Sequence, residues 1–400
     1  MSAPLRIALF TYSTKPRGGV IHTLALAEHL QALGHAVHIF ALGKDQAGFF
    51  RPTTVPFSLI PFAVLPDDMV IDERIQRYIQ AYFDFLMADR LAPYDIYHVQ
   101  DCVSANAVWR VREAGRLNSF VRTVHHVDDF VSPGLIQCQK DSIYRPNHRI
   151  VVSQYWQNQL REDFGVASTI IYSGVDHERY SPATATRRQA ARAGLGLANE
   201  FVFLHIGGIE PRKNTVRLVR AYQRVKQALD AKGQPSLLLL AGGETMLDYT
   251  PFRQEFFALL EHSGLHPDKD VRLLGVVADD RMPGLYQAAD ALVFPSVKEG
   301  WGLVVLEAQA SGLPVLSSAL PVFHEYLRTG ENAVLVNPFD EGAIADGMLQ
   351  LANDANLRRK LIQAGLLTAQ QFTWEATARA HEACYRQWLE ATAESATGTD

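Results

Sequence analysis

The stretch Phe201-Val-Phe-Leu-His-Ile206-Gly-Gly208-Ile-Glu-Pro-Arg212-Lys213-Asn214 joins an apolar run to a glycine turn and a pair of cations. The apolar run is aliphatic and aromatic, which predicts a buried strand over residues 201–206. The residues after the turn predict a helix over 215–229, and a second apolar run predicts a strand over 237–240. A strand, a helix and another strand in succession are typical of a parallel sheet covered by helices.

The same alternation extends outward from this stretch and occurs twice along the chain. In the second half, the sequence predicts further strands at 271–274, 291–294, 315–317 and 333–336, with helices at 252–262, 303–310 and 340–352. In the first half, it predicts strands at 5–10, 35–42, 95–99, 120–124 and 150–152, with helices between 18 and 34 and at 71–91, 105–116 and 154–164. We therefore expect an α/β protein with two doubly wound, Rossmann-like parallel-sheet domains.

The predicted domains cover residues 1–180 and 200–373. Residues 181–199 are small, polar and turn-rich, which favours a linker, and residues 374–390 are expected to form a helix that crosses back to the first domain. Residues 391–400 are small and polar and are expected to be disordered. Because ligands of parallel sheets bind outside the carboxyl ends of the strands, we expect a site in a cleft that the two domains face.

The composition excludes several classes of protein. The 400 residues carry a net charge of −5 without the basic excess of a nucleic-acid binder, and no apolar run reaches the length of a transmembrane helix. The first residues are typical of a strand and not of a signal peptide, and the three cysteines lack metal-ligand spacing, so a cytoplasmic location is expected. The arginines of the first half leave peripheral membrane contact open, although the interrupting Glu113 favours a solvated face; they are Arg110, Arg112, Arg116 and Arg122.

A second informative segment runs from Phe294-Pro-Ser296 to Gly312-Leu-Pro314. Gly302 frees the backbone at the start of a predicted helix, and a helix N-terminus offers unpaired N–H groups that suit a phosphate. Glu307 lies about 7 Å along that helix, roughly the distance from a diphosphate to a ribose, and Glu299 precedes the helix. A carboxylate accepts hydrogen bonds from two neighbouring hydroxyls, although two glutamates at this spacing also occur for structural reasons alone.

In this order and spacing, the motifs resemble the E-x7-E signature of retaining glycosyltransferases of the GT-B fold, group 1, family four. The resemblance covers nearly the whole chain and includes four further motifs, Gly18-Gly19-Val20, Ser173-Gly174-Val175-Asp176 (the family usually has Asn at 173), Glu210-Pro-Arg-Lys213-Asn and Ala241-Gly-Gly243. It implies transfer of a sugar from a UDP-, GDP- or ADP-linked donor to an acceptor that the sequence does not identify, whether glycan, lipid or small molecule. The second domain would hold the donor and the first the acceptor.

The resemblance also implies roles for individual residues. Glu307 would bind the ribose hydroxyls, Glu299 the 3-hydroxyl of the donor sugar, and the amides near Gly302 and Leu303 the phosphate. Gly18 and Gly19 would let the backbone approach the donor, although a tight turn explains them equally.

His125, in the segment His125-His126-Val127-Asp128-Asp129, would lie against the donor sugar near its anomeric carbon. A structural histidine and a metal site are the alternatives for this segment, but no further ligand is spaced nearby.

Breaking a sugar–phosphate bond releases a diphosphate whose growing charge needs a metal or fixed cations. The sequence has no DxD-type cluster in a suitable place, so we expect Arg212 and Lys213 to supply the charge, with neither a metal nor pyridoxal phosphate as cofactor. Lys213 matches the family's lysine, but Gly208 stands where the family usually has an arginine, and Arg212 is expected to replace it. As merely solvated cations, both side chains would oppose the dipole of the following helix.

Retention usually requires a carboxylate nucleophile, and no residue of the first domain matches one. The resemblance implies instead a front-side attack in which the leaving phosphate takes the proton of the acceptor. Asp101 and Asp128 are candidate acceptor contacts. Two rival functions remain open: a nucleotide-sugar 2-epimerase of the same fold, for which we find no acid/base set on both sugar faces, and a non-catalytic sugar-nucleotide binding protein.

Overall fold

The computed structural model describes residues 3–43, 48–63, 65–66, 68–90, 93–243 and 249–397. The chain divides into two compact units, each built on its own sheet. Unit 1 comprises Met1–Gly174 and Trp374–Asp400, and unit 2 comprises Val175–Thr373.

Unit 1 is built on a seven-stranded parallel sheet with the strand order β3-β2-β1-β4-β5-β6-β7. Its strands are β1 (Arg6–Thr11), β2 (Ala36–Leu42), β3 (Phe57–Ile60), β4 (Ile96–Val99), β5 (Val121–Val124), β6 (His148–Val151) and β7 (Thr169–Ile170). Its helices are α1 (Gly18–Ala32), α2 (Ile71–Phe85), which the π-helical turn η1 (Leu86–Arg90) continues, α3 (Cys102–Glu113), α4 (Pro133–Tyr144), α5 (Gln154–Phe164) and α13 (Trp374–Thr397).

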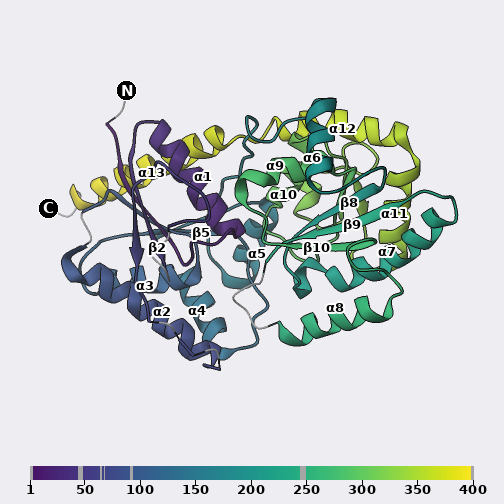
Figure 1. Cartoon of the computed structure of the whole chain (residues 1–400). Coiled ribbons are helices and arrows are strands. Elements are labelled where there is room, and N and C mark those ends of the chain that lie inside the picture. Colours follow the sequence, from purple (N-terminus) through teal and green to yellow (C-terminus); the bar gives the residue numbers. More distant parts are fainter. Residues whose placement is uncertain are drawn as a thin grey trace. The chain divides into compact units, whose positions relative to one another are not determined.

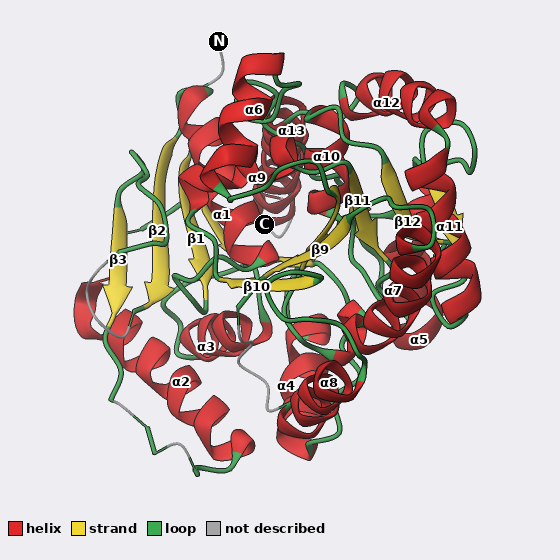
Figure 2. Ribbon diagram, turned by 45° about the vertical axis from the view of Figure 1, so that its right-hand side comes forward, coloured by secondary structure: helices red, strands yellow, loops and turns green. Residues whose placement is uncertain are grey.

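Helices cover both faces of the unit 1 sheet. Figures 1 and 2 show α1 and α13 on one face and α2, α3 and α4 on the other. On the first face, Ile7 and Leu9 pack against Leu24 of α1 and Tyr385 of α13 in one buried cluster. Full burial of a large aliphatic side chain contributes about 1.5–3 kcal/mol, which explains why the central strands read as continuous apolar runs in the sequence.

Unit 2 has a six-stranded parallel sheet with the order β10-β9-β8-β11-β12-β13. Its strands are β8 (Phe201–Ile206), β9 (Ser236–Ala241), β10 (Val271–Gly275), β11 (Ala291–Phe294), β12 (Val315–Ser318) and β13 (Val334–Val336). Its α-helices are α6 (Ala185–Gly194), α7 (Thr215–Asp230), α8 (Thr250–His262), α9 (Met282–Ala288), α10 (Leu303–Ala310), α11 (Glu341–Asn353) and α12 (Ala355–Ala369). The 3₁₀ turns among the described residues of unit 2 are η2 (Pro211–Lys213), η3 (Asp279–Arg281) and η4 (Phe323–Glu325).

The prediction of two doubly wound parallel-sheet domains is confirmed. In each sheet the strand order reverses direction next to the first strand, β1 or β8, so that β4 and β11 lie on its other side. Ligands of such sheets bind where the order reverses, at the carboxyl ends of the strands. The loops after β1, β4, β8 and β11 are therefore the places in which to look for a site.

The predicted linker at 181–199 contains helix α6 instead. Thr184 caps this helix by accepting a hydrogen bond from the amide of Arg187, and the helix interior is rich in alanine and arginine, which are good helix formers. Arg188 anchors it within unit 2 through an ion pair with Asp290, at 2.6 Å. The sequence prediction weighted the small residues as turn formers and missed this helix.

The C-terminal segment also differs from the prediction. Helix α13 runs to Thr397, so most of the tail that was expected to be disordered is helical. Residues 398–400 lie outside the described residues. The helix packs on the unit 1 sheet through Ala378 and Tyr385, and this apolar stripe explains why it belongs to unit 1 although the rest of unit 1 precedes unit 2 in the chain.

Candidate active site

The two predicted cations lie in the turn that follows β8. Arg212 and Lys213 form part of the 3₁₀ turn η2, and α7 begins two residues after Lys213. Asn214, which lies between this turn and α7, adopts a left-handed backbone with a φ of 62°, which asparagine tolerates. The Asn214 amide donates to the carbonyls of Pro295, at 2.9 Å, and Pro338, at 2.6 Å. These two bonds hold the cationic turn against the loops that follow β11 and β13.

Lys213 pairs with Glu299. Its Nζ lies 2.5 Å from Oε1 of Glu299 and 4.4 Å from the centre of the Phe294 ring. Burial lowers the pKa of Lys213, helped by the adjacent Arg212, while Glu299 works in the opposite direction. Burial alone would raise the pKa of Glu299, but Lys213 and Arg212 outweigh it and hold that pKa below its ordinary value. The contact thus favours the ionised form of Glu299, while burial opposes the charge on Lys213.

Arg212 joins the same ionic cluster. Its guanidinium lies 3.0 Å from Glu210 and 3.3 Å from Glu299. Two cations and two carboxylates thus form one compact group at the carboxyl end of β8, with no net charge. The Arg212 side chain is 30% exposed while that of Lys213 is 10% exposed, so Arg212 is the more accessible of the two.

The glycines around this cluster allow three segments to meet. A Cβ on Gly242, after β9, would lie 2.2 Å from the carbonyl oxygen of Gly207 and 2.8 Å from the nitrogen of Gly208. A Cβ on Gly207 would lie 3.0 Å from the Lys213 side chain. Gly208 therefore lies in a turn whose backbone another strand end contacts directly.

Gly302 is the residue before α10, and its conformation requires glycine. Its φ is +91°, and a Cβ there would lie 2.5 Å from the Phe323 ring. The Tyr326 hydroxyl donates to the carbonyl of Trp301 at 2.8 Å and fixes the same turn. Among the described residues, no side chain caps the α10 N-terminus, and Leu303 is partly exposed there. The amides at the start of α10 are thus available to an anion.

Glu307 lies one turn further along α10 and is buried. Its Oε2 accepts a hydrogen bond from the Tyr286 hydroxyl at 2.6 Å. Burial raises the pKa of Glu307 to about 7, although Tyr286 and Arg179 act to lower it. Arg179 is itself held by Asp279, at 2.7 Å. Sequence reasoning missed Tyr286 and Arg179, since no motif marks them and they approach Glu307 only through the fold.

In unit 1, His125 follows β5 and lies beside the start of α1. Its Nε2 is 3.1 Å from Oε1 of Gln100, and its ring is 4.8 Å from that of His22. Burial lowers the pKa of His125 to about 3, so the imidazole is neutral at ordinary pH. A Cβ on Gly19 would lie 3.6 Å from this ring, whereas a Cβ on Gly18 would meet nothing within 4 Å. The structure therefore brings Gly19 and His125 together and leaves Gly18 open.

The two candidate acceptor contacts also make structural bonds. Asp101 caps α3 by accepting from the amide of Ser104, at 2.8 Å, and from its hydroxyl, at 2.9 Å. Burial raises the pKa of Asp101 to about 6. The Asp128 carboxylate lies 3.1 Å from Nε2 of His126, and its backbone amide donates to Gln139 at 2.7 Å. These bonds give both aspartates a structural explanation, and an acceptor role for them remains a proposal.

Arg122 contradicts the expectation of a solvated arginine face. It lies in β5 and is 5% exposed, and burial lowers its pKa. Arg110 and Arg112 lie on the surface as expected, where they bond to Gln76 and to the carbonyl of Arg145, respectively. The prediction failed for Arg122 because it treated four arginines as one surface group, although Arg122 alone falls within a strand.

Within the ranges that the structure describes, no three His, Cys, Asp or Glu side chains are arranged to hold a metal ion. No helix in the same ranges is long and apolar enough to cross a membrane.

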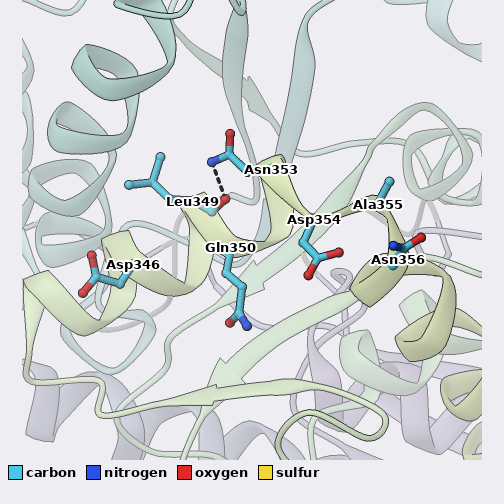
Figure 3. A pocket seen from close by; sticks show the side chains of 7 residues that line it. All are labelled: Asp346, Leu349, Gln350, Asn353, Asp354, Ala355 and Asn356. Carbon is cyan, nitrogen blue, oxygen red and sulfur yellow. Dashed lines mark hydrogen bonds between the residues drawn. The ribbon is translucent and has the colours of Figure 1, made fainter.

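A hollow of about 730 Å³ on the surface of α11 and α12 contains none of the predicted site residues. Figure 3 shows the residues that line it, which are mostly polar: Asp346, Leu349, Gln350, Asn353, Asp354, Ala355 and Asn356.

Comparison with known proteins places this arrangement in a family. The family model described as Glycosyl transferases group 1 matches residues 187–367, and the model described as Glycosyltransferase Family 4 matches residues 16–179. The chain is 33% identical over 214 residues to the D-inositol 3-phosphate glycosyltransferase of Salinispora arenicola, which covers 52% of this chain and 47%, about half, of that relative. The protein of the same name from Corynebacterium glutamicum is 24% identical over 405 residues, which covers 94% of each chain.

Solved structures share the fold. Sucrose-phosphate synthase from Thermosynechococcus elongatus superposes with a TM-score of 0.79 at 23% identity, covering 96% of this chain and 99% of that one. HepE of Anabaena, in complex with UDP and glucose, superposes with a TM-score of 0.76 at 18% identity, covering 96% of this chain and 100% of that one. Two parallel-sheet units of this kind define the GT-B fold. With the two family models matching in succession, the chain belongs to the group 1 glycosyltransferases.

Proposed function

We propose that this glycosyltransferase moves a sugar from a nucleotide-sugar donor to its acceptor with retention of the anomeric configuration and without a metal ion. The observation that carries the proposal is the cluster of Lys213, Arg212 and Glu299 beside the loop that leads into α10. It combines fixed cations, an open helix N-terminus and a buried carboxylate at Glu307 within one unit. The cations and the helix N-terminus both suit the diphosphate of a sugar nucleotide, and the carboxylate of Glu307 suits its ribose.

Lys213 and Arg212 act on the leaving group in this mechanism. The bond between the anomeric carbon and the phosphate oxygen breaks with its electron pair passing to the phosphate. Lys213, Arg212 and the amides at Leu303 stabilise that growing charge, as fixed donors do in an oxyanion hole. The acceptor hydroxyl oxygen bonds to the anomeric carbon on the same face, and its proton passes to the leaving phosphate.

In this mechanism Arg212 replaces the arginine that is missing at position 208. Glycine stands at 208, and the more exposed Arg212 contacts Glu299, the carboxylate that Lys213 also contacts. When Glu299 accepts a hydrogen bond from the 3-hydroxyl of the donor sugar, Arg212 and Lys213 are released in part toward the diphosphate. Arg212 thus supplies the second cation from a shifted position.

Unit 1 contributes His125, which contacts the donor sugar as a neutral imidazole. Gly18 and Gly19 leave room for the donor beside that ring, and Asp101 and Asp128 contact the acceptor. The relatives named D-inositol 3-phosphate glycosyltransferase support a phosphorylated polyol as the acceptor class.

The test is incubation of the protein with UDP-, GDP- or ADP-glucose, with and without D-inositol 3-phosphate, followed by NMR of the products. We expect nucleoside diphosphate release and a new glycoside with the donor's anomeric configuration, unaffected by EDTA. Conversion of the donor sugar without acceptor would instead indicate an epimerase, and tight donor binding without any product would indicate a binding protein. An inverted product, or loss of turnover in EDTA, would contradict the retaining and metal-free parts of the proposal.

A further inference from the structure

A chain of hydrogen bonds connects His125 to helix α13 through the interior of unit 1. His125 Nε2 lies 3.1 Å from Gln100 Oε1, and Gln100 Nε2 lies 3.2 Å from His98 Nε2. His98 Nδ1 in turn lies 2.6 Å from the hydroxyl of Tyr385, which is 287 residues away in the chain. Gln100 is 3% exposed, and both His98 and Tyr385 are fully buried. Water therefore does not compete for the inner bonds.

In this series of hydrogen bonds, the donor and the acceptor of each bond are defined because the residues are neutral. Burial lowers the pKa of His98 well below its ordinary range, so its ring carries one N–H and one lone pair. Burial likewise raises the pKa of Tyr385 well above its ordinary range and keeps its proton. Each ring nitrogen in the chain is thus a donor or an acceptor, and fixing one role fixes those of its neighbours.

The orientation of the Gln100 amide sets these roles. Its oxygen faces His125, so His125 Nε2 carries the proton, and its nitrogen donates to the lone pair of His98 Nε2. The proton of His98 then lies on Nδ1 and is donated to Tyr385. Thr123 Oγ1 also lies 2.8 Å from His98 Nε2. His125 Nδ1 makes no hydrogen bond within the described residues and remains an acceptor.

We propose that Gln100, His98 and Tyr385 are positioning residues that hold His125 as its Nε2–H tautomer, so that Nδ1 accepts a hydrogen bond from a hydroxyl of the donor sugar. This inference rests on the proposed function for its consequence, though not for its geometry. A sugar hydroxyl that donates to Nδ1 would be oriented by a residue of α13 that contacts no substrate itself. Through the hydrogen bond between His98 and Tyr385, helix α13 therefore contributes to the recognition of the donor sugar by unit 1.

The direct test is NMR of the full chain labelled with ¹⁵N in its histidine rings, which distinguishes the two tautomers. The variant His125→Asn assigns the His125 signals by their loss. We expect His125 as Nε2–H and His98 as Nδ1–H in the unaltered protein. His125 observed as Nδ1–H would overturn the proposal whether or not the protein shows transferase activity.

Two substitutions at Gln100 test whether this residue acts through its hydrogen bonds or only by filling space. Gln100→Glu can only accept, so His125 should stay Nε2–H while His98 reverses to Nε2–H. Gln100→Leu keeps the volume and removes both bonds, so His125 should become a mixture of tautomers. With UDP-glucose as the probe donor, kcat should fall on the order of tenfold in Gln100→Leu, with a smaller change in KM, and should largely recover in Gln100→Glu. Equal losses in both variants would indicate a packing role alone.

Tyr385→Phe tests the far end of the chain. Without the phenol oxygen, His98 should donate from Nε2 to Thr123, the Gln100 amide should turn over, and His125 should reverse to Nδ1–H. The control is Tyr222→Phe, which removes an equally buried hydroxyl that bonds to Ser236 at 3.2 Å in unit 2. The control should leave the His125 signals and kcat unchanged. An unchanged His125 tautomer in Tyr385→Phe would contradict the proposal, whereas inactivity of every variant and of the unaltered protein on UDP-glucose would count against the proposed function only.

Discussion

The two units bury their polar site residues in opposite ways. Unit 1 surrounds its candidate site with uncharged imidazoles, while unit 2 fills its own with paired ions. Both lie at the carboxyl ends of strands in doubly wound parallel sheets, so the architecture does not explain the difference. We infer that the difference follows from what each site does to its ligand.

In unit 1, burial keeps several histidines neutral. His22, His98 and His381 are at most 1% exposed, and burial lowers the pKa of each, that of His381 to about 4. A neutral imidazole costs far less to bury than a charge and still presents a directed donor and acceptor. Such a site can orient hydroxyl groups.

In unit 2, the buried groups compensate one another in charge. Lys213 and Glu299 would each be costly to bury alone, and their contact at 2.5 Å together with Arg212 offsets that cost. A set of fixed ions can respond to charge that develops on a leaving phosphate, which neutral imidazoles do less well. The comparison suggests that unit 1 orients the sugar and unit 2 stabilises the leaving group, and four predictions test it.

The largest expected effect is a selective loss of unit 1 stability in acid. The buried histidines bind no proton in the folded state above their lowered pKa values, whereas the unfolded chain takes one up at each below pH 6.5. Stability is therefore full above pH 6.5 and falls between there and about pH 4. Between pH 7 and pH 5 the loss is about 2 kcal/mol for His381, whose pKa is about 4 in the folded state, and His22 and His98 act in the same direction. The proton that Asp101 takes up near pH 6 offsets only part of this loss.

In unit 2, the two opposing shifts nearly cancel over the same range. His205 has its pKa lowered to about 4 by burial and costs stability in acid. Glu307, with its pKa raised to about 7, takes up a proton when folded and adds stability as the pH falls through 7. Hydrogen exchange of the full chain should show β4, β5 and α13 losing protection before β8 and β9. Uniform protection down to pH 5 would remove the proposed contrast.

The next effect is on catalysis in unit 2. Lys213→Ala should lose about 3 kcal/mol of transition-state stabilisation, a fall in kcat of about a hundredfold or more, because a fixed cation at the leaving phosphate is gone. Lys226→Ala is the control, since Lys226 pairs with Asp230 and Asp270 elsewhere in the same unit. Steady-state kinetics of nucleoside diphosphate release would measure both variants. A Lys213→Ala protein with unaltered turnover would leave the ionic cluster with a structural role only.

The third effect compares a glycine from each unit. Gly302→Ala should destabilise the protein by about 2 kcal/mol, because its φ of +91° is unfavourable for alanine and its Cβ would overlap the Phe323 ring. Gly18→Ala should change stability by less than about 0.5 kcal/mol, since a Cβ there meets nothing within 4 Å. Urea unfolding would measure both. A loss of activity in a fully stable Gly18→Ala protein would then point to the ligand, while destabilisation would show that this glycine serves the turn.

The smallest effect is the pH dependence of donor binding. If Glu307 must be ionised to accept hydrogen bonds from the ribose hydroxyls, donor affinity should fall as the pH drops below about 7, by at most about tenfold per pH unit. Glu307→Gln should bind more weakly and lose this dependence. Glu255→Gln is the control, because its carboxylate pairs with Arg220 at the surface. Calorimetric titration with UDP at pH 6, 7 and 8 measures the trend, and a flat profile in the unaltered protein would contradict it.

Much of the architecture was accessible from the sequence because burial leaves a periodic pattern. The strand from 201 to 206 and that from 291 to 294 match their predicted bounds, since central strands of a covered sheet are continuously apolar. Short edge strands such as β3 and β7 escaped prediction because they are only partly buried and carry little pattern. Helix α6 escaped because alanine and small polar residues are ambiguous without their packing partners.

Within the site, the order of the motifs identified Lys213, Glu299 and Glu307, but their pairing was not readable. Glu299 turned out to hold Lys213 and Arg212 together, and Glu307 turned out to bond to Tyr286. Arg122 was misjudged for the same reason, since its burial depends on the sheet around it and not on its neighbours in the chain.

The amino-acid sequence by itself determined the alternation of strands and helices, the family and the identity of the charged residues at the strand ends. These are local properties, set by the burial of each side chain and by turns a few residues long. Only the tertiary structure decided which groups are paired, which are neutral and in which direction their hydrogen bonds run. Those properties depend on desolvation and on partners as distant as His98 and Tyr385, 287 positions apart, and no local pattern encodes such a contact.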